Sequence, residues 1–456
     1  DIGVTGVQTC ALPIYSSLKK FEHANRVVPD KILVMDAQAL VNQLADTARL
    51  ATRTLTLASG AERATALKLI ADEIESRAFE IQEANQSDME RGKRDGLNSQ
   101  LLDRLMLNDA RIKGIANGAR QVANLEDPLG QTLRERTLPN GLHLRQISVP
   151  FGVIGMVYEA RPNVTVDAAV ILLMSGNAAL LRGSSSAESS NQVLVKIMRD
   201  ALSKTKISPD VIQLIPSNDR ATTTALLKAR GHVDLVIPRG SASLIRMVVD
   251  EATVPTIETG AGVCHVYVDK DANLDKAIPI LINSKTHRPS VCNAAETLLV
   301  HTDIAEKFLP MAMKALNESG VVMHVDQEAG KYAEVLGIRA QAATAADWST
   351  EYGVLEMNVG IVDSVEAASA HIAKYGTNHT ESIVTENKET AERFVKLSDC
   401  AAVMINASTR FTDGEQMGFG AEIGISNQKL HARGPMGLEQ MTTTTWIVTG
   451  DGQIRQ

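Results

Sequence analysis

The chain has 456 residues, of which 44 % are hydrophobic and 22 % charged, a composition typical of a globular protein of two or three domains. Its net charge of −8 argues against a nucleic-acid or anionic-membrane partner, and its longest apolar run, residues 168–174, is far shorter than the ~20 residues that cross a bilayer. Four cysteines without a CxxC pair argue against a disulfide framework or a zinc ribbon, so we expect a soluble protein of the cytoplasm with packed α/β layers.

The first 34 residues differ from the rest of the chain. Residues 4–14 (VTGVQTCALPI) resemble the translation of a sequencing-adapter oligonucleotide, a contaminant of assembled genes. The stretch lacks helical periodicity, and it lacks the basic region and long apolar core of a signal peptide. Helical amphipathicity begins only after Met35. We therefore expect residues 1–34 to be a foreign or disordered extension and Met35 to be the natural start.

From Met35 to about Val122 the pattern is helical. Ser59 and Glu62 stand three residues apart, which is the spacing of a capping box at a helix start. Beyond them, apolar residues at steps of three and four predict one face of a helix, formed by Leu67, Ile70, Ile74, Ala78 and Ile81.

Two segments far apart in the chain predict antiparallel strands. Residues 138–147 alternate polar and apolar side chains around Asn140-Gly141, which indicates a β-hairpin. Residues 442–450 are rich in β-branched residues and read as a terminal strand. Such segments suit an arm between subunits, and an ordinary surface hairpin is the equally weighted alternative.

Short apolar runs alternate with helical ones from Gly152 to Asp269. This alternation predicts right-handed βαβ units and a parallel sheet, with its sites at the carboxyl ends of the strands. The expected strands are residues 152–158, 178–182, 211–215, 234–237 and 265–269.

A second α/β region is expected after Asn273. Residues 406–437 are rich in Gly, Ser and Thr and read as a long loop, and long loops in compact domains are usually functional. The other elements expected there are helices at 274–282 and 303–316 and strands at 297–301 and 401–406.

Two strand–helix junctions are candidates for binding a phosphate. At the first, Arg182 and Gly183 precede Ser184 and Ser185 at the start of a helix, where free N–H groups and the helix dipole attract anions. The second junction, at residues 237–243, repeats the design with Gly240 and Ser241. The alternative for each junction is a plain capped helix.

Cys292 is the candidate nucleophile. Cys264 and Cys400 adjoin apolar strand segments and read as small core residues. Cys292 instead follows a polar loop that carries Lys285, His287 and Arg288. Because nearby positive charge lowers the pKa of a thiol, we expect Cys292 to be activated by this loop.

The roles of Asn163 and Glu258 are open on the residues alone. Asn163 follows a predicted strand and begins a helix, so it either caps that helix or donates to an oxyanion. Glu258 ends a strand and is either a general base or a solvated carboxylate.

Cations gather late in the chain. Lys429, His431 and Arg433 alternate along one segment, which suits carboxylate or phosphate binding. His371, Tyr375 and His379 recur at four-residue steps without the carboxylates or cysteines of a metal site, so no metal is expected.

Six motifs in order resemble the gamma-glutamyl phosphate reductase family of the aldehyde dehydrogenase superfamily, over residues 35–455. The resemblance implies an aldehyde dehydrogenase-like α/β fold with two parallel-sheet domains and a small β-arm for oligomerisation. By it, residues 35–136 and 150–269 form an NADP-binding domain, 270–439 a catalytic domain, and 137–149 with 440–453 the arm. The motifs are VPFGVIGMVYEARPNVTVDAA (149–169), ALLRGSSSA (179–187), SKTHRPSVCNAAETLLVH (284–301), HIAKYGTNHTESIVT (371–385), INASTRFTDG (405–414) and QKLHARGPMGLE (428–439).

The resemblance also implies an activity, namely NADPH-dependent reduction of L-glutamate 5-phosphate to the semialdehyde in proline biosynthesis. Cys292 then corresponds to the nucleophile, Asn163 to the oxyanion donor and Glu258 to the deacylating glutamate of other aldehyde dehydrogenases. Such a glutamate would hydrolyse the thioester that must be reduced, so the role of Glu258 stays open.

Several expectations depend on this implied activity. Arg182 and its serines favour a 2′-phosphate on the cofactor. The alternatives are a non-phosphorylating aldehyde dehydrogenase and a non-catalytic nucleotide-binding protein. A homo-oligomer and a separate glutamate 5-kinase are the expected partners. The cations proposed to bind substrate are Arg288, Arg410, Lys429 and Arg433, with Lys285 and His287 as further candidates.

Overall fold

The computed structural model describes residues 36–159, 161–216 and 219–455. The chain divides into two units, Asp1–Asp36 and Ala37–Gln456, and the second carries the fold described below. The expectations for residues 1–34 and for Met35 lie outside the described residues.

The described chain begins with a helical region, as expected. Ser59 and Glu62 form the capping box: the Ser59 N–H donates to Glu62 Oε2 at 2.9 Å, and the Glu62 N–H donates to Ser59 Oγ at 3.2 Å. The expected single apolar face is divided between two helices, because the chain turns at Arg77. The helices are α1 (Ala37–Leu57), α2 (Gly60–Ser76), α3 (Ala78–Arg94), α4 (Ser99–Leu105) and α5 (Asp109–Ala123).

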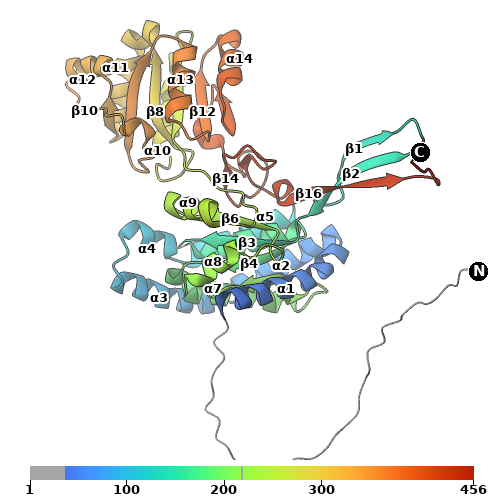
Figure 1. Cartoon of the computed structure of the whole chain (residues 1–456). Coiled ribbons are helices and arrows are strands. Elements are labelled where there is room, and N and C mark those ends of the chain that lie inside the picture. The colour runs from blue at the N-terminus through green and yellow to red at the C-terminus, as the bar shows by residue number, and fades with distance from the viewer. Residues whose placement is uncertain (1–35, 160, 217–218, 456) are drawn as a thin grey trace, which may run out of the picture. The chain divides into compact units, whose positions relative to one another are not determined.

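A parallel sheet of four strands follows, in the spatial order β5-β4-β3-β6. Helices α1 and α6 both contact β3 and β4, and most side chains of α6 are buried. Figure 1 shows these strands among the helices of the first half of the chain. The elements are β3 (Val153–Tyr158), α6 (Pro162–Met174), β4 (Ala178–Arg182), α7 (Glu188–Leu202), β5 (Ile212–Leu214), α8 (Ala221–Leu227), β6 (Leu235–Arg239) and α9 (Ala242–Glu251).

A second parallel sheet has seven strands in the order β10-β9-β11-β8-β7-β12-β13. Alternate residues of its strands face two different cores: Val266 packs with α10, α11 and α12, whereas Tyr267 packs with α13 and α14. Its elements are β7 (Cys264–Val268), α10 (Leu274–Thr286), β8 (Ala295–His301), α11 (Thr302–Glu318), β9 (Val322–Val325), α12 (Gln327–Leu336), β10 (Gln341–Ala342), β11 (Glu356–Val362), α13 (Val365–Tyr375), β12 (Thr380–Val384), α14 (Lys388–Leu397) and β13 (Ala402–Ile405).

The expected boundary between the two α/β regions, at residue 269, is wrong because of strand β7. The sequence places residues 265–269 with the preceding strands, but β7 hydrogen-bonds to β8 and β12 in the second sheet. The sheet change therefore falls between β6 and β7, in residues 240–263. Because a buried parallel strand looks the same in either sheet, the pattern of apolar residues did not reveal this.

The expected hairpin and terminal strand form one antiparallel sheet of three strands, with β2 (His143–Pro150) between β1 (Thr132–Thr137) and β16 (Thr442–Thr449). The turn is at Gly141, whose φ of +85° favours glycine. Every residue of β1 is exposed, and so are Trp446, Ile447 and Val448 of β16. Figure 1 shows this sheet standing away from the nearby helices.

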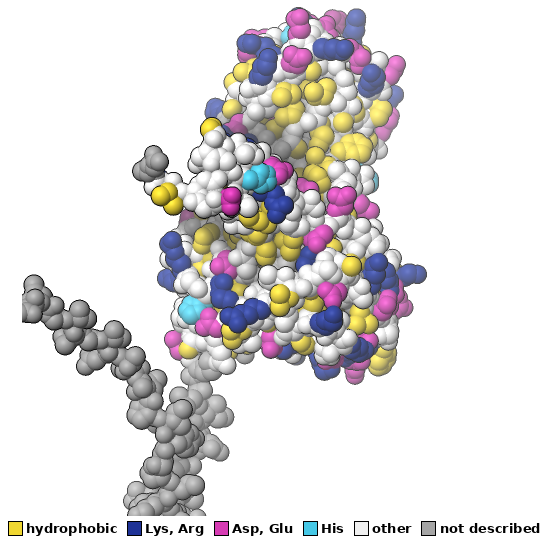
Figure 2. Space-filling model, turned by 90° about the vertical axis from the view of Figure 1, so that its right-hand side faces the viewer, with side chains coloured by type: hydrophobic (Ala, Val, Ile, Leu, Met, Phe, Trp, Pro, Cys, Tyr) yellow, Lys and Arg dark blue, Asp and Glu magenta, His cyan; other side chains and the backbone are white. Residues whose placement is uncertain are grey.

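Acidic and basic side chains alternate over the described face drawn in Figure 2, on which they do not gather in one basic patch. No helix in the described residues is both long enough and apolar enough to span a membrane.

Candidate active site

Cys292 lies in the turn between α10 and β8, at the amino end of a central strand of the seven-stranded sheet. Its side chain is half-buried. Two neighbours fix its backbone: Cys264 Sγ donates to the Cys292 carbonyl at 3.2 Å, and a β-carbon on Gly262 would lie 1.4 Å from the same oxygen. Only glycine fits at residue 262, and this close packing holds the cysteine turn in place.

The expected activation of Cys292 by its own loop is wrong. Burial raises the pKa of its thiol to about 11, and the strongest opposing influence is the positive charge of Arg239, outside that loop. Lys285 is fully buried and pairs with the equally buried Glu296 at 2.5 Å. Lys285 lies in the last turn of α10, where its charge is paired with Glu296, and the Cys292 thiol is protonated at neutral pH.

Three arginines interact electrostatically with Cys292, namely Arg161, Arg239 and Arg410, and a fourth, Arg288, acts on Arg161 and Arg410. Burial, together with repulsion from Arg239 and Arg288, lowers the pKa of Arg161 to about 10. Burial lowers the pKa of Arg410 too, and Cys292 acts on both Arg161 and Arg410. Within the described residues none of the four forms an ion pair with a carboxylate. Arg161, Arg239 and Arg410 are half-buried and Arg288 is exposed. Arginines that are not committed to an ion pair suit the binding of an anion.

Two of the expected substrate cations are engaged elsewhere. Arg433 Nη2 lies 2.9 Å from Asp399 Oδ1, and Lys429 Nζ lies 2.6 Å from Oδ2 of the same carboxylate. Both interactions lower the pKa of Asp399. Arg288 and Arg410 do lie near each other, since the charge of Arg288 lowers the pKa of Arg410, and Arg410 Nε also donates to His287 Nδ1 at 3.4 Å.

Asn163 does not cap α6. Arg161 occupies the cap position, Pro162 opens the helix, and Asn163 is its second residue. The Asn163 side-chain nitrogen Nδ2 instead donates to Asp167 Oδ2 at 2.9 Å, one turn further along the helix. The capping interpretation is therefore wrong, and the amide is held by a neighbouring carboxylate.

Glu258 is bound to Gln428 through two hydrogen bonds. Gln428 Nε2 donates to Glu258 Oε1 at 2.5 Å, and the Glu258 backbone N–H donates to Gln428 Oε1 at 3.0 Å. Residue 428 belongs to the last sequence motif, so this contact joins the end of the first α/β region to the long loop before β16.

The phosphate candidate after β4 differs from the expectation. Ser184 caps a short 3₁₀ turn that precedes α7, and its hydroxyl accepts from the Ser186 N–H at 3.2 Å. The N–H groups of Ser189 and Ser190 at the start of α7 already donate to the buried Asp88 carboxylate, at 3.1 and 2.8 Å. The α7 terminus is thus occupied by the protein itself.

Arg182 and Gly183 remain at the edge of that junction. Arg182 is half-buried, which lowers its pKa. A β-carbon on Gly183 would lie 2.2 Å from Asn191 Nδ2 and close to the Tyr158 ring, so only glycine fits there. The backbone at the carboxyl end of β4 therefore packs directly against the side chains of Asn191 and Tyr158.

The second phosphate candidate, at the start of α9, already binds a carboxylate of the protein. The Ser241 backbone N–H donates to Glu159 Oε2 at 2.7 Å, and the Ser241 hydroxyl donates to Oε1 at 2.9 Å. Glu159 is exposed, and Gly240 packs against it. Its carboxylate occupies the place that a phosphate oxygen takes at a helix N-terminus.

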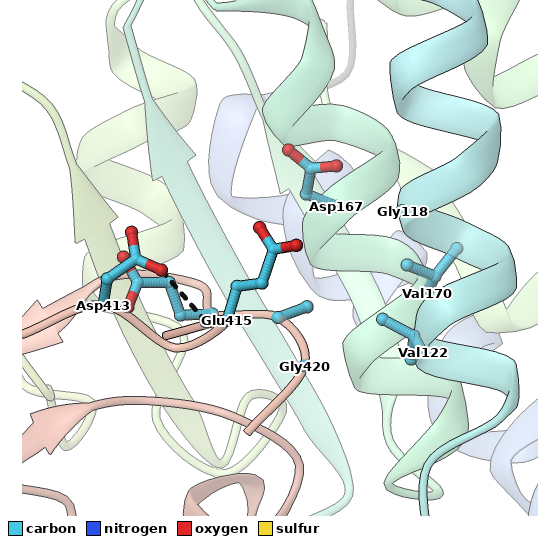
Figure 3. Close-up of a pocket in the computed structure, with 9 residues that line it drawn as sticks. Gly118, Val122, Asp167, Val170, Asp413, Glu415 and Gly420 are labelled. Carbon is cyan, nitrogen blue, oxygen red and sulfur yellow. Dashed lines mark hydrogen bonds between the residues drawn. The ribbon is translucent and has the colours of Figure 1, made fainter. Parts of the chain in front are cut away.

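A cavity of about 230 Å³ adjoins α6. Figure 3 shows the Asp167 side chain directed toward it, opposite Asp413 and Glu415 of the loop before β16. Glu422 lines the same cavity and raises the pKa of the Cys292 thiol, which places the cavity near the cysteine. In the described residues no group of three or more His, Cys, Asp or Glu side chains is arranged to hold a metal ion.

The sequence analysis missed four residues: Arg161, Arg239, Asp167 and Glu159. For three of them the sequence held a signal. Glu159 and Arg161 come just after the expected strand 152–158, and Arg239 comes just after the expected strand 234–237, where parallel sheets carry their sites.

Comparisons with known proteins show the family of this chain. Residues 16–332 match the model of the aldehyde dehydrogenase family. The gamma-glutamyl phosphate reductase of Thermobifida fusca is 52 % identical over 92 % of this chain and 100 % of that protein, and that of Kineococcus radiotolerans is 53 % identical over 90 % and 94 %. This chain belongs to the gamma-glutamyl phosphate reductases of the aldehyde dehydrogenase family.

The solved structures confirm the expected fold class. The crystal structure of gamma-glutamyl phosphate reductase from Thermotoga maritima is 44 % identical, with a TM-score of 0.88 over 91 % of this chain and 100 % of that one. The aldehyde dehydrogenase-like α/β fold with its two parallel sheets is therefore established for this chain.

Proposed function

We propose that this protein reduces L-glutamate 5-phosphate to L-glutamate 5-semialdehyde with release of phosphate, the second step of proline biosynthesis from glutamate. The observation that carries the proposal is the half-buried Cys292 thiol near Arg161, Arg239 and Arg410, none of which forms an ion pair within the described residues. A nucleophile beside an anion site suits a substrate whose reacting carbonyl bears a phosphate leaving group. The names of the relatives support the same substrate.

In the proposed reaction the Cys292 sulfur attacks the acyl carbon of the substrate. The thiol loses its proton to solvent as a carbon–sulfur bond forms, the bond from that carbon to the phosphate oxygen breaks, and phosphate leaves with the electron pair. After hydride has been added to the thioester carbon, the carbon–sulfur bond breaks, which releases the semialdehyde and restores the cysteine. Arg239 supports the thiolate, because its charge opposes the rise in the Cys292 pKa. Arg161, Arg288 and Arg410 supply further positive charge for the phosphate.

The negative oxygen that forms during attack needs donors. We assign the Asn163 side-chain N–H and the backbone N–H of Cys292 to this role. A donor of this kind is worth about 3–4 kcal/mol in the transition state. The hydrogen bond from Asn163 to Asp167 keeps the amide in one orientation.

The residues around α9 and β4 fit a dinucleotide. Ser241 with Gly240 offers a helix N-terminus for the diphosphate, and Glu159 marks the position of an anionic oxygen there. Arg182, Gly183, Ser184 and Ser185 line the carboxyl end of β4, where Arg182 and the serines favour a ribose 2′-phosphate and hence NADPH over NADH. Membership of a dehydrogenase family implies a nicotinamide cofactor, which supplies hydride to the thioester carbon when bound.

The alternative is a non-phosphorylating aldehyde dehydrogenase, in which Glu258 activates water to hydrolyse the thioester. The pairing of Glu258 with Gln428 argues against this, since the carboxylate oxygen Oε1 is already a hydrogen-bond acceptor at 2.5 Å. We assign Glu258 to positioning the loop that carries residue 428.

The proposal also assigns a role to each part of the fold. We assign residues 37–136 and 150–263 to cofactor binding, 264–439 to catalysis, and the three-stranded sheet to an arm that joins copies of the chain. Exposed Trp446, Ile447 and Val448 on the edge strand β16 support the arm.

A separate glutamate 5-kinase would supply the unstable acyl phosphate. A location in the cytoplasm is consistent with the unpaired cysteines Cys264, Cys292 and Cys400.

The reverse reaction tests the proposal. Purified protein is mixed with L-glutamate 5-semialdehyde and NADP, with and without inorganic phosphate, and reduction of NADP is followed by absorbance. We expect reduction only when phosphate is present, and faster reduction with NADP than with NAD. Equal rates without phosphate would favour the non-phosphorylating alternative.

A further inference from the structure

We infer that Asp167 is a positioning residue for this reaction: it holds the Asn163 amide with its N–H group, rather than its oxygen, toward the reacting carbonyl. The inference rests on the proposed function, because Asn163 acts there as an oxyanion donor.

The place of Asp167 in the fold is unusual for a carboxylate. It is the one charged side chain of helix α6, whose other residues are mostly apolar and buried. Placing an ionised group in such surroundings costs free energy unless a hydrogen-bond partner stabilises it. The partner here is Asn163, whose Nδ2 donates to Asp167 Oδ2 at 2.9 Å.

The chemistry of the two groups selects one orientation of the amide. The Asn163 side chain has a donor end, Nδ2 with two N–H groups, and an acceptor end, Oδ1. An ionised carboxylate only accepts, so it attracts Nδ2 and repels Oδ1. With one N–H bound to Asp167, the second N–H of the same nitrogen is left for the oxyanion. Without the carboxylate, rotation of the amide by 180° would place its oxygen there.

Several charged groups face Asp167. Arg239, at the end of β6, lowers its pKa, and burial raises it to about 6. Asp413, Glu415 and Glu422 line the same cavity from the loop before β16, and Figure 3 shows the first two across the cavity. Helix α5 contributes only Gly118 and Val122 to this lining, which carry no charge. Asp167 is thus ionised above about pH 6 and protonated below it.

A double-mutant cycle tests whether Asp167 acts through Asn163. In the phosphate-dependent assay, Asn163→Ala is expected to lower kcat by about 100- to 1000-fold, and Asp167→Ala by at least about 10-fold with little change in the KM for semialdehyde. In the Asn163→Ala background, Asp167→Ala is expected to change kcat by less than about twofold. Losses that multiply instead would show an independent role and would overturn the inference.

The pH profile provides a measurement that a merely structural role leaves unchanged. The wild-type kcat is expected to fall as the pH is lowered through about 6, since protonated Asp167 also donates and so tolerates the rotated amide. Asp167→Asn, which has the same shape, is expected to fold normally, to lose about 3- to 10-fold in kcat, and to lack this limb of the profile. An unchanged limb in Asp167→Asn would contradict the inference, whether or not Asp167→Ala folds.

Glu334→Gln is the matched control. Glu334 is an exposed carboxylate of α12 and does not line the cavity, so its removal changes the net charge without touching Asn163 or Asp167. We expect its kcat and pH profile to match the wild type, and thermal unfolding checks that every variant is folded. A folded wild-type protein without phosphate-dependent turnover would reject the proposed function, and the inference with it. Normal wild-type turnover with a fully active Asp167→Ala would reject the inference alone.

Discussion

Gly262 and the carbonyl oxygen of Cys292 lie so close together that a β-carbon on residue 262 would be 1.4 Å from that oxygen. The contact joins the segment before β7 to the turn before β8, which are neighbouring strands of the seven-stranded sheet. The cysteine turn therefore depends on a glycine 30 residues earlier in the chain.

Gly262→Ala is expected to displace the Cys292 turn. The added methyl group cannot fit, so the backbone must move, and we expect a loss of about 1–3 kcal/mol in the free energy of unfolding. Because the nucleophile moves with the backbone, kcat in the phosphate-dependent assay should fall by at least about 10-fold. Urea unfolding and steady-state kinetics measure the two effects.

Gly114→Ala is the control for this substitution. Gly114 lies within α5, and a β-carbon there meets nothing within 4 Å. Alanine in a helix interior should raise the free energy of unfolding by about 0.5–1 kcal/mol and leave kcat unchanged. A Gly262→Ala protein as active as Gly114→Ala would show that the turn tolerates the shift.

Cys292→Ala is expected to abolish turnover, because no other sulfur takes its place: Cys264 is fully buried, and burial raises its pKa well above the usual value. NADPH binding, followed by the cofactor's fluorescence, should be retained, since the proposed cofactor residues lie on the other sheet. Cys400→Ala is the matched control and should turn over normally. Residual turnover in Cys292→Ala would exclude the thioester route.

The thiol of Cys292 is expected to react slowly with iodoacetamide at neutral pH. Its pKa of about 11 leaves little thiolate, so the alkylation rate should rise as the pH is raised toward that value. Arg239 lowers the pKa, and Arg239→Met should therefore move the pH profile to higher pH. Mass spectrometry of the Cys292 peptide measures the rate.

Arg53→Met is the control for the alkylation experiment, because Arg53 is an exposed residue of α1. Its profile should coincide with that of the wild type. Rapid alkylation of the wild type at pH 7 would mean that the free protein already holds a thiolate, contrary to the burial of this thiol.

Glu159→Gln is expected to strengthen cofactor binding. The Glu159 carboxylate binds the Ser241 N–H and hydroxyl at the start of α9, so it competes with a diphosphate for the same donors. A neutral amide competes less, and we expect the Kd for NADPH to fall about 3- to 10-fold. Fluorescence titration measures the Kd.

Glu251→Gln supplies the comparison for that titration. It removes the same charge from the opposite end of α9, where Glu251 is exposed. Its Kd should stay near that of the wild type. If both variants bind NADPH more tightly to the same degree, the cause is net charge and not competition at Ser241.

Much of the fold follows from local sequence. The apolar runs at 153–158 and 178–181 form strands that are buried along their whole length, and the Asn140-Gly141 turn forms because glycine tolerates a φ of +85°. The capping box of Ser59 and Glu62 likewise involves residues only three apart. In each case the deciding interactions lie within a few residues.

The sheet to which a strand belongs is not decided locally. Strand β7 has the same apolar pattern as the strands before it, yet its hydrogen bonds join it to β8 and β12. Strand pairing depends on contacts between distant segments, and a strand buried on both faces carries no mark of its neighbours.

The site shows the same division. Sequence alone pointed to Cys292 as the reactive position, because a cysteine in a polar loop stands out from cysteines in apolar strands. Which charges act on that thiol was decided by tertiary structure: Lys285, seven residues away in the chain, pairs with Glu296, whereas Arg239, 53 residues away, opposes the rise in the thiol pKa. Electrostatic interaction depends on distance in space and on burial, and neither quantity can be read from spacing along the chain.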